Sequence, residues 1–148
     1  MRRVGGYSLD EFPPEGPWNL SKLVSGSEGT LATILECKVN LVEPPKHIGV
    51  VAIHYDELFS SFRSTPIILK YDPLSVELMD RKVIELSKGN PSTRDMCHFI
   101  EGLPGAILAT EITGDSEEEV TQKIEALERD LRAAGYGYAF PTMRTAEA

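Results

Sequence analysis

The stretch AILATEITGDSEEEVTQKIEALERDLRAA, residues 106–134, predicts a strand followed by a long helix. Residues 106–113 are mostly apolar and have the length of a strand. Ser116 and Glu119 have the spacing of a capping box, which begins a helix by satisfying its first backbone amides. The apolar residues that follow recur at steps of four, three and four and form one stripe: Val120, Ile124, Leu127 and Leu131. This helix is therefore expected to pack one face against a sheet.

The same alternation of strands and helices extends over the whole chain from residue 47. Strands are also predicted at residues 48–55, 74–78 and 136–140, and a short helix near residues 91–100. Asp56 is placed to cap the next helix. Pro66 either ends that helix or starts a second short helix that runs through Leu69. Asp80 is placed to cap another helix, which should turn three residues inward: Val83, Ile84 and Leu86.

Four short strands separated by helices are compatible with two architectures. One is a parallel α/β sheet, and the other is a split βαβ sandwich that resembles ferredoxin. Parallel strands are usually near-continuous runs of valine and isoleucine, whereas these strands are short and mixed in composition. The pattern favours an α+β fold, with a ferredoxin-like antiparallel sheet and helices on one face.

The residues before position 47 do not show this alternation of strands and helices. Residues 1–22 are rich in glycine and proline and predict an irregular arm. Residues 30–42, TLATILECKVNLV, alternate between apolar and polar side chains and predict a strand, with Cys37 as a small core residue. Pro44 and Pro45 end that strand because proline has no amide to donate to a ladder. The double proline is the predicted boundary between two units.

Between arm and strand lies a short loop, GSEGTL, at residues 26–31. Gly26 and Gly29 lack a Cβ atom, so the backbone can adopt positive φ angles and a planar or phosphorylated ligand can approach closely. Ser27 and Thr30 add hydroxyl groups, and the loop amides can face phosphate oxygens. The spacing alone is more typical of a tight turn without a ligand, because short loops of glycine and serine are common.

GSEGTL, preceded by NLSKL and followed by a strand that ends in Pro-Pro, resembles the FAD-linked oxidase family. The family has the flavoprotein fold of vanillyl-alcohol oxidase and includes D-lactate, glycolate and D-2-hydroxyglutarate dehydrogenases. Residues 2–10 resemble the family's arm in its large members that carry an iron–sulfur module, and residues 75–80 and 114–119 resemble its substrate-side cap domain. The resemblance covers nearly the whole chain.

This resemblance implies an FAD cofactor in the complete protein. The residues that match the family's FAD-lining loop and strand are Gly26, Ser27, Glu28, Gly29, Thr30, Leu31 and Ile34. Ala32 stands where the family usually has a further glycine, which puts a very close backbone approach at that position in doubt.

The resemblance also implies a fragment. Residues 1–46 match the end of the FAD-binding domain, and residues 47–148 match part of the cap domain. The family's upstream phosphate-binding glycine segments, and its downstream arginine-bearing stretch and histidine-rich metal motif, have no counterpart in this sequence. The expected function is a share in the oxidation of a 2-hydroxy acid to a 2-oxo acid, and the isolated chain is expected to be inactive. The expected partners are the missing remainder, the hydroxy acid and an iron–sulfur electron acceptor.

An alternative is a stand-alone ferredoxin-like module that binds or oligomerises without catalysis. No catalytic residue is assigned, because Asp80 is better explained as a helix cap, Glu111 as a buried and partnered or a sheet-surface carboxylate, and His54 as a packed or surface histidine. The three histidines are too scattered for a metal site. A net charge of −8 without a basic cluster disfavours nucleic acid. No apolar run suits a signal peptide or a membrane span, so a cytoplasmic protein is expected.

Overall fold

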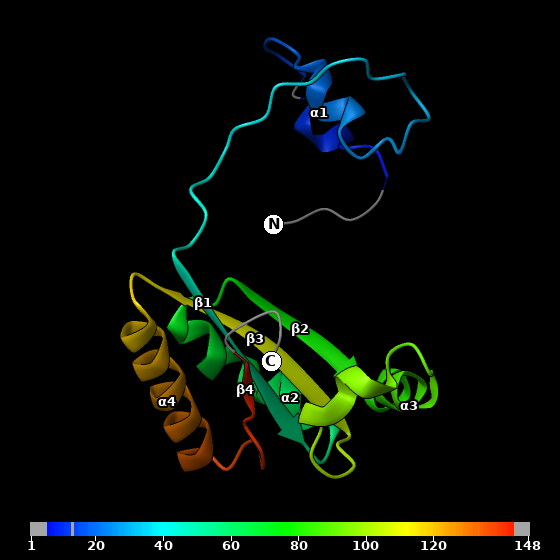
Figure 1. The fold of residues 1–148 in the computed structure, drawn as a ribbon. Helices are drawn as coiled ribbons and strands as arrows, with labels where there is room; N and C mark the ends of the chain where they lie inside the picture. Colours follow the sequence, from blue (N-terminus) through cyan, green and yellow to red (C-terminus); the bar gives the residue numbers. More distant parts are fainter. Residues whose placement is uncertain (1–5, 13, 144–148) are drawn as a thin grey trace. The chain divides into compact units, whose positions relative to one another are not determined.

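The computed structural model describes residues 6–12 and 14–143. The beginning of the predicted arm, residues 2–5, lies outside the described residues. The chain divides into two compact units, Met1–Val42 and Glu43–Ala148, which are treated separately (Figure 1).

The second unit is built on one four-stranded sheet (Figure 1). Its strands are β1 (His47–Tyr55), β2 (Ser75–Asp80), β3 (Ala106–Gly114) and β4 (Thr142–Met143). Their spatial order is β2-β3-β1-β4, and every neighbouring pair is antiparallel. The α+β fold with an antiparallel sheet is therefore confirmed, and the strand order is that of a split βαβ sandwich.

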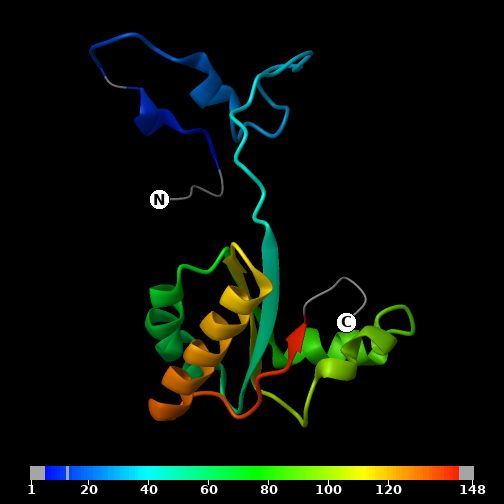
Figure 2. The same cartoon turned by 60° about the vertical axis from the view of Figure 1, so that its left-hand side comes forward.

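The two longest helices, α2 (Leu58–Ile68) and α4 (Glu117–Ala133), contact the same face of the sheet (Figure 2). Ser116 accepts a hydrogen bond from the amide of Glu119, as the capping box predicts. All four residues of the predicted stripe are buried, and they pack against the strands: Val51, Ile53, Tyr55, Leu108 and Ile112. The stretch from residue 106 to 134 thus forms both sides of the main core.

A smaller cluster lies on the opposite face of the sheet. The helix α3 (Arg81–Gly89) and the 3-10 helix η3 (Arg94–Phe99) lie on this side, so helices cover more than the one face expected from the sequence (Figure 2). Of the three residues predicted to turn inward on α3, only Ile84 is buried. Val83 and Leu86 are 47% and 61% exposed. The prediction was wrong for these two because a step of about 100° per residue places them around the helix from Ile84.

Two further predicted boundaries need correction. The final strand is Thr142–Met143 rather than residues 136–140, where Ala139 forms only a single bridge to His54. Gly137 has a φ of +75°, which interrupts the extended backbone before the strand. The cap of α2 is Glu57 rather than Asp56, and Pro66 lies inside that helix, which continues into the 3-10 helix η2 (Leu69–Tyr71).

The first unit contains the 3-10 helix η1 (Leu9–Glu11) and the short helix α1 (Leu20–Val24). Within the described residues, the predicted strand at 30–42 pairs with no other strand, and its residues are exposed, Cys37 included. The prediction of a strand and of a core cysteine was therefore wrong for this structure. The physical reason is that an alternating sequence becomes a strand only when another strand supplies hydrogen-bond partners.

Candidate functional site

The glycine-rich loop is entered from α1. The side chain of Asn19 begins this helix by accepting a hydrogen bond from the amide of Ser21, at 3.0 Å. After the helix the backbone takes the left-handed conformation three times, at Gly26 (φ +89°), Glu28 (φ +51°) and Gly29 (φ +77°). Left-handed backbone is uncommon for a residue with a side chain, so Glu28 is in an unusual position. The two glycines stand where the turn requires them.

The loop supports itself through Ser27, its one buried residue. The amide of Ser27 donates to the carbonyl of Val24 at 3.0 Å. Both the amide and the hydroxyl of Thr30 donate to the carbonyl of Ser27, at 2.9 and 2.6 Å. The Tyr7 hydroxyl lies 2.7 Å from the Thr30 hydroxyl. Since that proton of Thr30 is already donated, Tyr7 is the donor, a contact that no local sequence signal announces.

The other side of the loop is open. Glu28, Gly29 and Leu31 are exposed, and no hydrogen bond within the described residues uses their amides. A Cβ atom added to Gly29 would meet no atom within 4 Å. The loop therefore offers free N–H donors on a surface that a flat group can approach.

The charge of the loop restricts what it can hold. Glu28 places a carboxylate beside the open amides, and the lysine of α1, Lys22, is already paired with Glu11. A diphosphate would therefore meet a negative charge there. An uncharged ring edge with carbonyl oxygens and ring nitrogens, such as that of a flavin, fits the donors better.

Ile34 lies beside a broader hollow of the first unit. This hollow has a volume of about 930 Å³ and runs between α1 and residues 32–39, with Leu20, Val24 and Ile34 among its lining residues. The structure thus places Gly26 to Leu31 on one continuous turn and Ile34 on a neighbouring surface. Their role in holding a cofactor stays a prediction.

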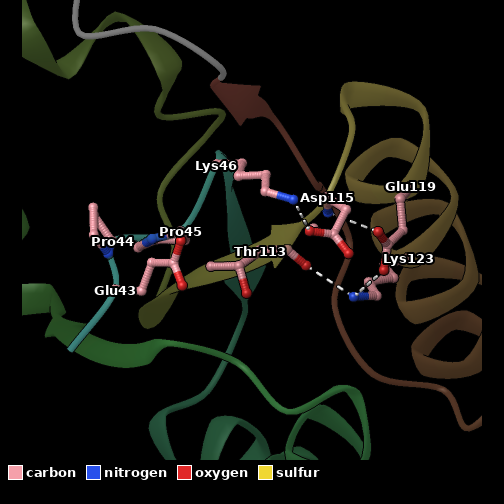
Figure 3. A pocket seen from close by; sticks show the side chains of 9 residues that line it. Glu43, Pro44, Pro45, Lys46, Thr113, Asp115, Glu119 and Lys123 are labelled. Carbon is pink, nitrogen blue, oxygen red and sulfur yellow. Dashed lines mark hydrogen bonds and ion pairs between the residues drawn. The ribbon is translucent and has the colours of Figure 1, made fainter.

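A second hollow lies at one end of the sheet in the second unit (Figure 3). Its cations are already engaged. The Lys46 ammonium donates to Asp115 at 2.9 Å, and Lys123 binds both Glu119, at 2.7 Å, and the carbonyl of Thr113, at 2.9 Å. The hydrogen bond and the charge of Asp115 raise the pKa of Lys46, and the same contact lowers the pKa of Asp115. The ion pair of Lys46 with Asp115 joins the residue before β1 to the turn before α4. Both lysines that line the hollow therefore already have partners.

His54 is a fully buried histidine, and histidine is a common catalytic base. The contacts of its ring show that it is a packing residue instead. Its Nδ1 atom lies 2.8 Å from the carbonyl of Ala52, which can only accept, so Nδ1 carries the proton. Its Nε2 atom accepts from the amide of Glu101 at 3.3 Å. The ring is therefore neutral, and the rings of Phe99 and Tyr138 meet it edge to face. Of the two interpretations, a packed or a surface histidine, the buried ring supports the first.

This arrangement predicts a pH-dependent stability. Burial lowers the pKa of His54 below its ordinary value of 6.5. The unfolded chain therefore binds a proton before the folded chain does, and the free energy of unfolding should fall as the pH drops below about 6.5. We expect thermal unfolding midpoints to decrease between about pH 7 and pH 5.5 for the native sequence, and His54→Gln to remove most of that slope. The exposed His98 is the control, and a His98→Gln variant that abolished the slope instead would contradict this assignment.

The remaining candidates give no second site. Asp80 accepts a hydrogen bond from the amide of Val83 at 2.8 Å and so caps α3, as predicted. Glu111 is half-buried on β3, between Val50 and Ser75 of the neighbouring strands. In the part of the chain that the structure describes, no three His, Cys, Asp or Glu side chains gather in a way that could hold a metal ion. Over the same residues, no helix has the length and apolarity that crossing a membrane requires.

Comparison with known proteins gives one matching family. The profile of the family "FAD linked oxidases, C-terminal domain" matches residues 44–148. Two similar proteins are the D-2-hydroxyglutarate dehydrogenases of Haemophilus influenzae, 32% identical over 136 residues, and Pseudomonas putida, 28% identical over 137 residues. These alignments cover 88% and 89% of this chain but 13% and 14% of the relatives.

A third relative is the D-lactate dehydrogenase of Anaerostipes hadrus, 27% identical over 121 residues. That alignment covers 80% of this chain and 26% of the relative. The chain thus spans between an eighth and about a quarter of the length of the relatives it matches.

Proposed function

Because this chain belongs to the family of FAD-linked oxidases, C-terminal domain, we propose that it forms part of an FAD-dependent dehydrogenase that oxidises a 2-hydroxy acid to a 2-oxo acid. Relatives named as dehydrogenases of D-2-hydroxyglutarate and D-lactate support this substrate class. When bound, FAD would supply the acceptor for the hydride from the substrate's α-carbon, and the residues proposed to hold it are those of the loop at 26–31 together with Ile34. The substrate's hydroxyl proton would be released, and the electrons would pass on to a separate acceptor.

The observation that carries the proposal is the open side of the loop at residues 26–31. The turn is held by its own hydrogen bonds, yet within the described residues no hydrogen bond uses the amides of the exposed residues Glu28, Gly29 and Leu31. A self-supporting loop of this kind is pre-organised, because little order is lost when a ligand binds. We propose that these amides contact the flavin and that residues 1–46 supply one wall of its cavity. Residues 47–148 contribute part of the cap over the substrate.

The partner in this proposal is the rest of the flavoprotein. Residues 31–42 carry exposed apolar side chains that suit a neighbouring domain, and the alignments leave most of each relative's length unmatched. An iron–sulfur module as electron acceptor belongs to the proposal too, and its support is the likeness of residues 2–10 to the family's arm.

The isolated chain should not hold the cofactor. Most contacts to a dinucleotide would come from residues that this sequence does not contain, so titration of FAD fluorescence with the 148-residue chain should show no measurable binding. Substrate turnover should be absent as well. Binding in the micromolar range would contradict the proposal, because it would show a complete site within these residues.

A further inference from the structure

Residues 100–104, called here the strap, connect η3 to β3 and contact the sheet at His54. Within the described residues, three side chains donate to carbonyls of the strap in exposed positions: Tyr138, Lys88 and Arg81. The amide of Glu101 differs, because it donates at 3.3 Å to Nε2 of His54, which is fully buried. An exposed hydrogen bond competes with water, whereas a buried partner is costly to leave unpaired. His54 therefore gives the strap its buried polar attachment.

The His54 ring cannot turn away from the strap. Its Nδ1 atom donates to the Ala52 carbonyl at 2.8 Å, and the rings of Phe99 and Tyr138 meet it edge to face. Its backbone amide donates to the Ala139 carbonyl at 2.9 Å, and its own carbonyl accepts from the Tyr138 amide at 2.9 Å. Because the ring and the backbone are both held, Nε2 stays directed at the strap.

A proton on Nε2 sets two donors against each other. Neutral imidazole has one donor and one acceptor, whereas the protonated ring has two donors. The bond to Ala52 survives protonation, but the N–H of Glu101 then points at a second N–H, with the two nitrogens 3.3 Å apart. A buried charge without an acceptor is costly, so the strap must move before the new proton can find one.

The charged groups that face His54 come from the strap and from α3. Burial lowers the pKa of His54, while its hydrogen bond to a carbonyl and the carboxylate of Glu101 act against this and the ammonium of Lys88 adds to it. The other neighbours of the ring are the uncharged side chains of Phe99 and Tyr138, and burial raises the pKa of the Tyr138 hydroxyl above its ordinary value of 10. With the strap open the ring meets water and its pKa returns to about 6.5, so acid favours the open strap.

We propose that His54 is a proton-controlled latch, whose neutral ring holds the strap against the sheet and whose protonated ring releases it while β1 and β3 stay paired. At the other end of the strap, the amide of Gly105 donates to the carbonyl of Tyr55 at 2.8 Å, a bond that acid does not change. The opening therefore begins at Glu101. The inference rests on contacts within the second unit and does not depend on the proposed flavin site.

Amide hydrogen exchange of the full 148-residue chain, followed by NMR, tests the latch. Between pH 7 and pH 5.5 the protection factor of the Glu101 amide should fall several-fold, towards a limit of about eightfold that the ordinary histidine pKa of 6.5 sets. About 1 M urea should not change this protection, because a local opening exposes little surface, whereas the Leu108 amide in the central strand β3 should lose protection. A Glu101 protection factor that is constant with pH would overturn the proposal. So would one that follows Leu108 in urea, since it would show unfolding of the whole unit.

Two variants separate the proton from the packing. His54→Gln should make the protection of the Glu101 amide independent of pH, because glutamine does not titrate. Tyr138→Phe is the matched control, since it removes the bond to the Glu101 carbonyl and keeps a ring beside His54. It should lower the protection at every pH and keep the several-fold fall. Loss of the pH dependence in Tyr138→Phe would contradict the assignment to His54.

The tautomer of His54 gives a test on the native chain that needs no substitution. Long-range proton–nitrogen correlation spectra at pH 7 should show a proton on Nδ1 and none on Nε2. On acidification, Nε2 should gain its proton over the same pH range in which the Glu101 amide signal shifts. A proton on Nε2 at pH 7 would overturn the latch, because the Glu101 amide would then have no acceptor there.

Discussion

Replacing Gly105 by alanine should destabilise the second unit by about 3 kcal/mol or more. A Cβ atom at Gly105 would lie 2.1 Å from the carbonyl oxygen of Asp56 and 2.8 Å from its carbonyl carbon. The Gly105 backbone cannot move away from the Asp56 carbonyl without losing hydrogen bonds. The amide of Gly105 donates to Tyr55 at 2.8 Å, and its carbonyl accepts from Arg81 at 3.1 Å. The added methyl group must therefore displace the end of β1 or break these bonds.

Thermal and urea unfolding followed by circular dichroism would measure this effect. A loss of about 3 kcal/mol should lower the thermal midpoint of a domain of this size by more than about 10 °C. Gly89→Ala is the matched control, because a Cβ atom there meets no atom within 4 Å and its φ angle is not positive. That variant should be neutral or slightly stabilising. An unchanged midpoint for Gly105→Ala would show that the loop before β3 does not approach β1 as described.

Replacing Gly29 by valine should reduce FAD retention at least about tenfold in a fusion of this chain with the flavin-binding portion of a relative. The φ angle of Gly29 is +77°, a conformation that a β-branched residue rarely adopts. The new side chain would also project from the open side of the loop, where the free amides are proposed to meet the flavin. The test uses a fusion of this chain to the flavin-binding portion of a relative such as the dehydrogenase of Haemophilus influenzae, with bound FAD quantified after gel filtration.

Gly135 provides a control for backbone strain. Its φ angle is also +77°, and a Cβ atom there meets nothing within 4 Å, but it lies after α4 in the second unit. Gly135→Val should carry the same local cost and leave FAD retention unchanged. If both valine variants lost the cofactor equally, strain would explain the effect and the loop would have no special role.

The sequence predicted best the parts of the fold that local patterns specify. The stripe from Val120 to Leu131 is buried as its spacing indicates, and Ser116 and Asp80 cap their helices as predicted. The antiparallel arrangement followed from short, mixed strands. These features depend on helix periodicity and on capping chemistry, which act within a few residues.

The sequence predicted poorly what distant residues decide. Residues 30–42 have the alternation of a strand, but no strand in the described part of the chain pairs with them. The last strand was predicted at residues 136–140 but is formed by Thr142–Met143, because the positive φ angle of Gly137 interrupts the extended backbone before it. The contact of Tyr7 with Thr30 joins residues that are 23 positions apart, so no local pattern announces it.

The sequence predicted part of the geometry of the loop at residues 26–31. The glycines of the loop predicted left-handed backbone, and Gly26 and Gly29 both adopt it. The free amides of Glu28, Gly29 and Leu31 were not predictable, because they depend on which donors the turn itself consumes. The charge of Glu28 beside them narrows the proposed contact to an uncharged part of the cofactor.

The most direct test of the account is the flavin content of that fusion with the native loop, measured against the flavin-binding portion alone. If residues 26–31 form one wall of the cavity, the purified fusion should be yellow and hold close to one FAD per chain, and the portion alone should hold far less. A folded but colourless fusion would contradict the claim that this chain completes a flavin site.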